Sequence, residues 1–303
     1  MLNPILSFSA TRRMRSFRTM LIVIGYVAAL LLIALAFLTP FLKDTVGMGT
    51  LSNGPTCFLA LLGAQFILLI LIAPAMTSGS IAGERERQTL DLLLVTNTQS
   101  FRIVIGKMLE SFVLLSLLIL CGLPVMCLCL LTGGISAWQI LAGEGFLLAV
   151  AFACVSVGVF CSSLSRSTVL SGVVTYLTLL LIGVVTALPF LFGYPQKITN
   201  VLYDTKQYAA LTPAGARGML SLLLCANPAF GLLALFQGNT HLLNETMRYR
   251  GWGRIYATWL MADRAGWDYI VLACTVGMLV ISLALLAASA LLIRRSTRKA
   301  KHR

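Results

Sequence analysis

Long apolar runs separated by short polar stretches set the pattern of this chain. A helix needs about 20 apolar residues to cross a bilayer, because roughly 30 Å of hydrocarbon is spanned at about 1.5 Å per residue. Six runs reach this length: Thr19–Leu42, Cys57–Thr77, Gly106–Leu131, Trp138–Leu164, Thr168–Phe192 and Tyr269–Ile293. The pattern predicts an all-α, polytopic membrane protein with six transmembrane helices.

The composition favours lipid over water as the solvent. Of the 303 residues, 58% are hydrophobic and 11% are charged, whereas soluble domains average about 45–50% and about 25%. The eight cysteines lie in or beside the apolar runs without a C-x-x-C pair, so we interpret them as small core residues. Only two histidines are present, His241 and His302. We therefore expect no metal site and no cofactor.

Basic residues gather on one side of the apolar runs. Fifteen Lys and Arg residues precede the first run, lie in the short loops after the second and fourth, or follow the sixth. The opposite short loops contain only Lys43. Because short basic loops stay in the cytoplasm, both termini are predicted to be cytoplasmic. The net charge of +13 is thus assigned to the membrane surface, and no nucleic-acid partner is expected.

Two regions outside the regular runs have their own character. Residues 1–18 begin at Asn3-Pro4, a favourable helix start, and place apolar and basic residues on opposite faces. We expect a cytoplasmic amphipathic helix at the interface; a basic flank that only fixes the topology is the alternative. The six-span transmembrane domain would then cover residues 19–303.

The second region, residues 193–268, is a large outer segment between the fifth and sixth runs. Its apolar stretch Met219–Phe236 is interrupted by Asn227-Pro228. A seventh span there would place the basic C-terminal tail outside. We therefore expect two short helices that are broken at the proline and are re-entrant or packed on the outer rim.

The loop after the second run carries the strongest functional signal. We name residues 78–102 the coupling segment. Small residues open it, a cluster of alternating charges follows, and an apolar tip comes next. On a helix, Glu84 can pair with Arg87, and Arg87 with Asp91. Such a rigid element is suited to dock into a groove on a soluble partner; a solvated loop that only flanks the membrane is the alternative.

The coupling segment resembles the corresponding loop in permeases of the type-2 ATP-binding-cassette transporter family. That family shows a proline in the second span, an Ile-Ala-x-Glu-x-Glu-x-Gly-Thr-Leu stretch, and a lysine at the start of the third span. The matching residues here are Pro74, Ile81-Ala82, Glu84, Glu86, Thr89-Leu90 and Gly106-Lys107. Gln88 replaces the usual glycine and Asn97 a frequent proline, which bears on the local turn geometry. The opening Asn3-Pro4-Ile5-Leu6 and the six-span layout also resemble the family.

The resemblance implies the permease subunit of an ATP-binding-cassette transporter, an exporter in a bacterial cell membrane. Separate cytoplasmic subunits would hydrolyse ATP, and a second permease chain, identical or related, would complete the path. The chain has no G-x-x-x-x-G-K-[ST] phosphate loop, so we do not expect it to be an enzyme. The residues expected to dock the ATPase subunits are Glu84, Arg85, Glu86, Arg87, Thr89, Leu90, Leu93 and Leu94.

A self-sufficient channel or secondary transporter is the alternative function. Such proteins usually carry ionisable residues deep in several spans or paired broken helices in two related halves. Few such residues occur here: the ionisable Glu110 and Glu144 stand out, together with the polar Gln65. We expect Glu110 to pair with Lys107, and Glu144 to mark where its helix leaves the headgroups. An intramembrane enzyme is less consistent with the sequence, which lacks H-E-x-x-H and G-x-S-x-G motifs.

Overall fold

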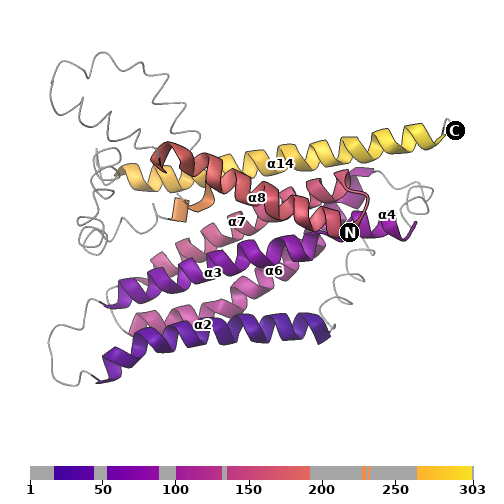
Figure 1. Ribbon diagram of the computed structural model, residues 1–303. Helices are drawn as coiled ribbons and strands as arrows, with labels where there is room; N and C mark the ends of the chain where they lie inside the picture. Colours follow the sequence, from indigo (N-terminus) through magenta and orange to yellow (C-terminus); the bar gives the residue numbers. More distant parts are fainter. Residues whose placement is uncertain are drawn as a thin grey trace, which may run out of the picture. The chain divides into compact units, whose positions relative to one another are not determined.

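The computed structural model describes residues 17–43, 53–88, 100–131, 135–191, 227–229, 231–232 and 265–301. These residues contain no strand, which confirms the all-α class. The helices are α2 (Phe17–Lys43), α3 (Asn53–Thr77), α4 (Ala82–Glu86), α6 (Ser100–Leu131), α7 (Ala137–Leu164), α8 (Thr168–Leu191) and α14 (Ala265–Lys301) (Figure 1). The chain divides into two compact units, one of residues 1–179 and 279–303 and one of residues 180–278, and each is described by itself.

Six helices of the described chain are long and apolar enough to cross a membrane. They are α2, α3, α6, α7, α8 and α14, and each coincides with one of the six apolar runs. The prediction of six transmembrane helices is confirmed. Helix α4 has five residues and is too short to span, and it lies in the loop that the sequence marks as functional.

The boundaries of α7 follow from local polar residues. Ser136 accepts a hydrogen bond from the backbone N–H of Gln139, and the Gln139 side chain accepts one from the backbone N–H of Ser136. This reciprocal capping box satisfies donors that the first turn leaves free. At the other end, Ser165 adopts an extended conformation after Leu164. Because α8 begins at Thr168, only a short turn separates the two helices.

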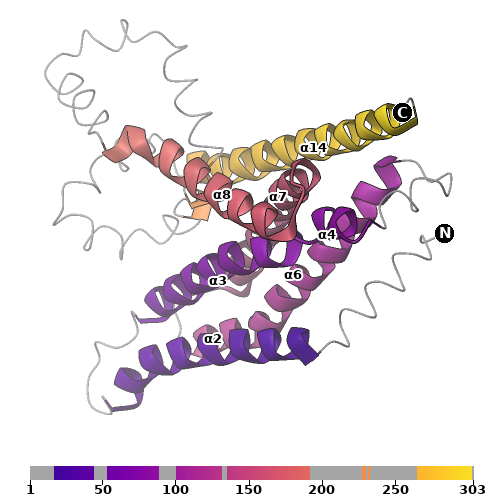
Figure 2. The ribbon, with the colours of Figure 1, turned by 45° about the vertical axis from the view of Figure 1, so that its right-hand side comes forward.

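Helices α3, α6 and α7 pack against one another and form the interior of the first unit, and α2 covers α3 and α6 (Figures 1 and 2). Two glycines of α7 bring its backbone close to α3. A Cβ on Gly143 would lie 2.9 Å from Leu62, and one on Gly158 would overlap the Thr77 side chain. Small residues at such positions allow membrane helices to approach closely.

Two predicted regions fall largely outside the described residues. The interfacial helix expected over residues 1–18 is described only from Phe17, where α2 begins. Within the outer segment, a short helical stretch starts at Pro228. Asn227 accepts a hydrogen bond from the backbone N–H of Ala229 at 2.9 Å, as a helix N-cap residue does. A helix start therefore lies at the point where the sequence predicted a break.

Candidate functional site

The coupling segment begins where α3 ends. Pro74 lies inside α3, and the last turn closes with a 2.9 Å hydrogen bond from the Ser78 N–H to the Pro74 carbonyl. The Thr77 hydroxyl also bonds back to the Ala73 carbonyl, at 2.9 Å. The small residues that follow form a tight turn, in which the Ser80 N–H donates to the Thr77 carbonyl. This turn leads directly into the single-turn helix α4.

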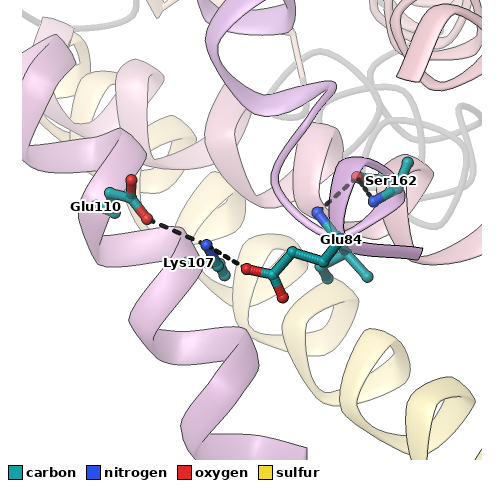
Figure 3. Close-up of polar contacts among 6 residues, drawn as sticks. Glu84, Lys107, Glu110 and Ser162 are labelled. Atoms are coloured by element: carbon teal, nitrogen blue, oxygen red, sulfur yellow. Dashed lines mark hydrogen bonds and ion pairs between the residues drawn. The ribbon is translucent and has the colours of Figure 1, made fainter. Parts of the chain in front are cut away.

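Ser162 of α7 fixes the start of α4. Its hydroxyl accepts hydrogen bonds from the backbone N–H groups of Ile81 and Ala82, at 3.0 and 2.9 Å (Figure 3). It also donates to the Ser78 carbonyl at 3.0 Å. The N-cap residue Ile81 has no side chain that caps α4. A hydroxyl from another helix therefore satisfies N–H groups that a helix start leaves without intrahelical partners.

Two consecutive side chains of α4 hold the turn between α7 and α8. The Arg85 guanidinium donates to the carbonyls of Ser165 and Ser163, at 2.7 and 3.1 Å. These carbonyls belong to the end of α7, where free acceptors and the helix dipole favour a cation. Glu86 accepts hydrogen bonds from the backbone N–H and hydroxyl of Thr168, at 3.2 and 2.9 Å. A carboxylate at the N-terminus of α8 is favoured for the complementary reason.

A third connection joins α4 to α6. The Lys107 ammonium lies 2.6 Å from the Glu84 carboxylate and 3.6 Å from that of Glu110 (Figure 3). Lys107 and Glu84 are partly exposed, with side chains 24% and 20% accessible, whereas Glu110 is 6% accessible. The predicted pairing of Lys107 with Glu110 is confirmed. Helix α4 is therefore attached to α6, α7 and α8 by charged or polar side chains.

Close packing supports these polar contacts. A Cβ on Gly83 would lie 3.3 Å from the Thr168 methyl group, and one on Gly79 would lie 3.9 Å from it. A Cβ on Gly172 would lie 3.5 Å from the Ser78 side chain. The two glycines of the Gly79-x-x-x-Gly83 pattern therefore both face the start of α8, and small residues let the backbone lie against it.

Two polar residues within the spans have side chains that are enclosed by protein. Gln65 is fully buried and Glu144 is 5% exposed. The Glu144 side chain is thus enclosed by protein, and its place where the helix leaves the headgroups stays a prediction. Gln65 lies beside Glu144 and Tyr26, and a Cβ on Gly122 would overlap its amide. The side chains of Tyr26, Gln65 and Glu144 thus bring α2, α3 and α7 together, and the Gln65 amide lies against the backbone of α6 at Gly122.

The structure separates the predicted docking residues into two groups. Glu84 and Arg85 point toward other helices, and Glu84 pairs with Lys107 rather than with Arg87 as the helical spacing had indicated. Glu86 and Arg87 are exposed. The other predicted docking residues lie outside the described residues: Thr89, Leu90, Leu93 and Leu94. Asp91, the predicted partner of Arg87, lies outside them as well.

Ser162 and Thr168 belong to this site but were not predicted from the sequence. The available signal is the polar run from Ser162 to Thr168, which interrupts two apolar helices at a turn on the basic side. The apolar runs Trp138–Leu164 and Thr168–Phe192 include Ser162 and Thr168 as ordinary ends of spans and give neither residue a role in the site. Nothing in the spacing of this polar run indicated a contact with the coupling segment. The hydrogen bonds between the two join residues that are 78 to 84 positions apart.

A family model described as "ABC-2 family transporter protein" matches residues 32–295, which include α4 and most of the six long helices. No curated protein matches the chain.

Proposed function

Because the chain belongs to the ABC-2 transporter family, as a multi-pass membrane subunit of an ABC transporter, we propose that it is an exporter permease driven by separate cytoplasmic ATPase subunits. A second permease chain, identical or related, completes the translocation path between the two. Both termini and the coupling segment lie in the cytoplasm, as the distribution of basic residues indicates. In this arrangement the chain supplies the path and the partner subunits supply the energy.

One observation carries the proposal: α4 is bound on three sides to the transmembrane helices while part of it remains exposed. Ser162 and Arg85 tie it to α7, Glu86 ties it to α8, and Glu84 ties it to α6. A five-residue helix held in this way cannot tilt without moving the helix ends that it contacts. It is therefore suited to pass a displacement of a soluble motor into the spans.

The contacts suggest a division of labour within the proposed docking residues. Glu84 and Arg85 act as anchors, because their charges are directed at Lys107 and at the end of α7. Glu86 and Arg87 present their exposed surfaces to the ATPase subunit. We place the apolar part of the contact on Thr89, Leu90, Leu93 and Leu94, as the sequence pattern indicates.

The first test asks whether an ATPase subunit binds the chain through α4. The chain is purified from its native membrane in mild detergent, and co-purified ATPase activity is measured per chain. Arg87→Glu should reduce the co-purified activity at least tenfold while the chain still inserts. Arg166→Glu is the matched control, because Arg166 is an exposed arginine on the α7–α8 turn outside the coupling segment, and it should retain the activity.

The second test determines on which side of the membrane the coupling segment lies. Gln88→Cys should react with a membrane-impermeant maleimide in inside-out vesicles and not in right-side-out vesicles, with the labelled peptide identified by mass spectrometry. Labelling from the outer side would remove the coupling role of α4. A wild-type chain that carries no ATPase subunit yet transports in vesicles without ATP would instead support the self-sufficient carrier.

A further inference from the structure

Two cysteines far apart in the sequence have their sulfur atoms in contact. The Cys129 thiol donates to the Cys57 sulfur at a distance of 3.5 Å, across 72 positions of the chain. Both residues are enclosed, with exposed fractions of 0% for Cys129 and 2% for Cys57. From the sequence, we interpret all eight cysteines as small core residues. The contact between these two sulfurs adds the chemistry of a thiol pair.

The position of the pair decides which redox environment it meets. Cys57 lies in the second turn of α3, and Cys129 lies in the last turn of α6. Glu84 and Lys107 lie near the opposite ends of the same two helices, where they form their ion pair. The proposed function places the coupling segment in the cytoplasm. On that basis, the two cysteines lie toward the outer side of the membrane. Disulfides form and persist in outer, oxidising compartments.

We propose that Cys57 and Cys129 are joined by a disulfide in the mature protein. A disulfide is about 2.05 Å long, so the two sulfurs, now 3.5 Å apart, must approach by about 1.5 Å for the bond to form. The contact between α3 and α6 that a disulfide requires is already present.

The oxidant is a disulfide-bearing thiol oxidoreductase of the outer compartment. The thiolate of one cysteine, after losing its proton, attacks the oxidant's disulfide, which forms a mixed disulfide and releases one oxidant sulfur as a thiolate. The second cysteine's thiolate then attacks the sulfur of the first and releases the other oxidant sulfur. Two electrons pass to the oxidant, which leaves as a dithiol carrying the two protons.

Burial determines when this exchange takes place. The folded bundle encloses both sulfurs, so the oxidant must reach them before α3 and α6 have closed. Once formed, the bond is shielded from reductants for the same reason. The disulfide is thus a permanent tie, and it joins α3 and α6 at the end opposite to the ion pair of Glu84 with Lys107. The two helices then respond to α4 as one body.

The test counts thiols in wild-type protein from native membranes. The membranes are quenched with acid, the chain is denatured, free thiols are alkylated, and the sample is reduced and alkylated with a heavy isotope. Cys57 and Cys129 should carry the heavy label, and a peptide linking them should appear without reduction. Cys154, equally enclosed at 4% exposure, should carry the light label. A light label on Cys57 and Cys129 at the level of Cys154 would overturn the proposal.

Variants show whether the two sulfurs are each other's partner. Cys57→Ser should convert Cys129 to the light label, and Cys129→Ser should do the same for Cys57. Cys161→Ser, another enclosed cysteine, should leave the linked peptide unchanged. A linked peptide of Cys57 with some other cysteine would contradict the assignment. In folded wild-type protein, a reductant should not reduce the disulfide between Cys57 and Cys129 until denaturant is added.

The outcome is separable from that of the proposed function. Thiol counting needs neither transport nor an ATPase subunit. If Gln88→Cys is labelled from the cytoplasm and the ATPase subunit co-purifies, a reduced pair removes the disulfide alone. If the linked peptide is found but no ATPase subunit binds, the disulfide stands and the docking role of α4 fails.

Discussion

Glu84 and Lys107 join the coupling segment to the third long helix through an ion pair of 2.6 Å. Glu84 lies in the single-turn helix α4, and Lys107 lies two turns inside α6, where its ammonium also faces Glu110. One cation therefore serves two carboxylates from two elements. The pair is partly shielded from solvent, so it is worth more than a fully exposed pair, whose contribution is usually below about 1 kcal/mol.

Removal of the Lys107 charge should loosen this attachment. Lys107→Gln leaves Glu84 and Glu110 facing each other without the cation between them, and we expect a loss of about 1–3 kcal/mol. Lys107→Arg keeps the charge and should recover most of that loss. The measurement is the midpoint of thermal unfolding in detergent. Arg102→Gln is the control, because Arg102 is exposed at the start of α6 and should change stability by less than about 0.5 kcal/mol. Equal midpoints for Lys107→Gln and Arg102→Gln would contradict the role of the pair.

Loss of the Ser162 hydroxyl should uncouple α4 from α7. Ser162→Ala leaves the N–H groups of Ile81 and Ala82 buried without this acceptor, at a cost of about 1–3 kcal/mol for each unsatisfied group. We expect a lower unfolding midpoint and less transport per ATP hydrolysed, with the ATPase subunit still bound. Ser156→Ala is the matched control, since the Ser156 hydroxyl donates to the Phe152 carbonyl of its own helix. Unchanged transport per ATP in Ser162→Ala would show that the displacement takes another route.

The close contact of α7 with α3 gives a steric prediction. A side chain at Gly158 would overlap Thr77, so Gly158→Ala should cost about 1–3 kcal/mol through overpacking. Gly145→Ala in the same helix meets nothing within 4 Å and should be neutral or slightly stabilising. The double variant Gly158→Ala, Thr77→Ala should regain part of the lost stability, because it removes the Thr77 Oγ1 that overlaps the added methyl group but keeps the Thr77 Cβ, 2.6 Å away. Thermal unfolding of five proteins checks this: wild type, Gly145→Ala, Gly158→Ala, Thr77→Ala and the double variant. Additivity of Gly158→Ala and Thr77→Ala in the double variant would exclude a direct contact.

The sequence predicted the spans well and the site only in part, for a physical reason. Each transmembrane helix is marked by a local run of apolar residues, and that run alone is enough to place it in lipid. The pairing of Lys107 with Glu110 is also local, three positions apart on one helix. The bonds of Ser162 and Thr168 to the coupling segment depend instead on how α3, α7 and α8 pack, which no local pattern encodes. The helical spacing even suggested Arg87 as the partner of Glu84, and the tertiary contact with Lys107 overrode it.

Gln88 gives the last prediction, because it departs from the family pattern at a strained position. It is the one non-glycine residue with a positive φ in the described part of the chain, at 57°, and it follows Arg87, which ends α4 at a φ of −83°. The left-handed conformation costs a non-glycine residue about 1–2 kcal/mol. Gln88→Gly should remove that strain, but glycine also has the greater conformational entropy in the unfolded chain, which offsets part of the gain. The net stabilisation of the turn should be about 0.5–1 kcal/mol.

The matched control changes the neighbouring residue in the same way. Arg87→Gly replaces a residue that already has a negative φ, so it gains nothing and should lose up to about 1 kcal/mol through the entropy of the unfolded chain. Thermal unfolding and the rate of proteolysis after α4 provide the comparison: Gln88→Gly should be cut more slowly than wild type, and Arg87→Gly faster. A β-branched residue is the least compatible with a positive φ, so Gln88→Val should be less stable than both Gln88→Gly and Arg87→Gly. If Gln88→Val matched Gln88→Gly, backbone strain at this turn would play no part in holding α4.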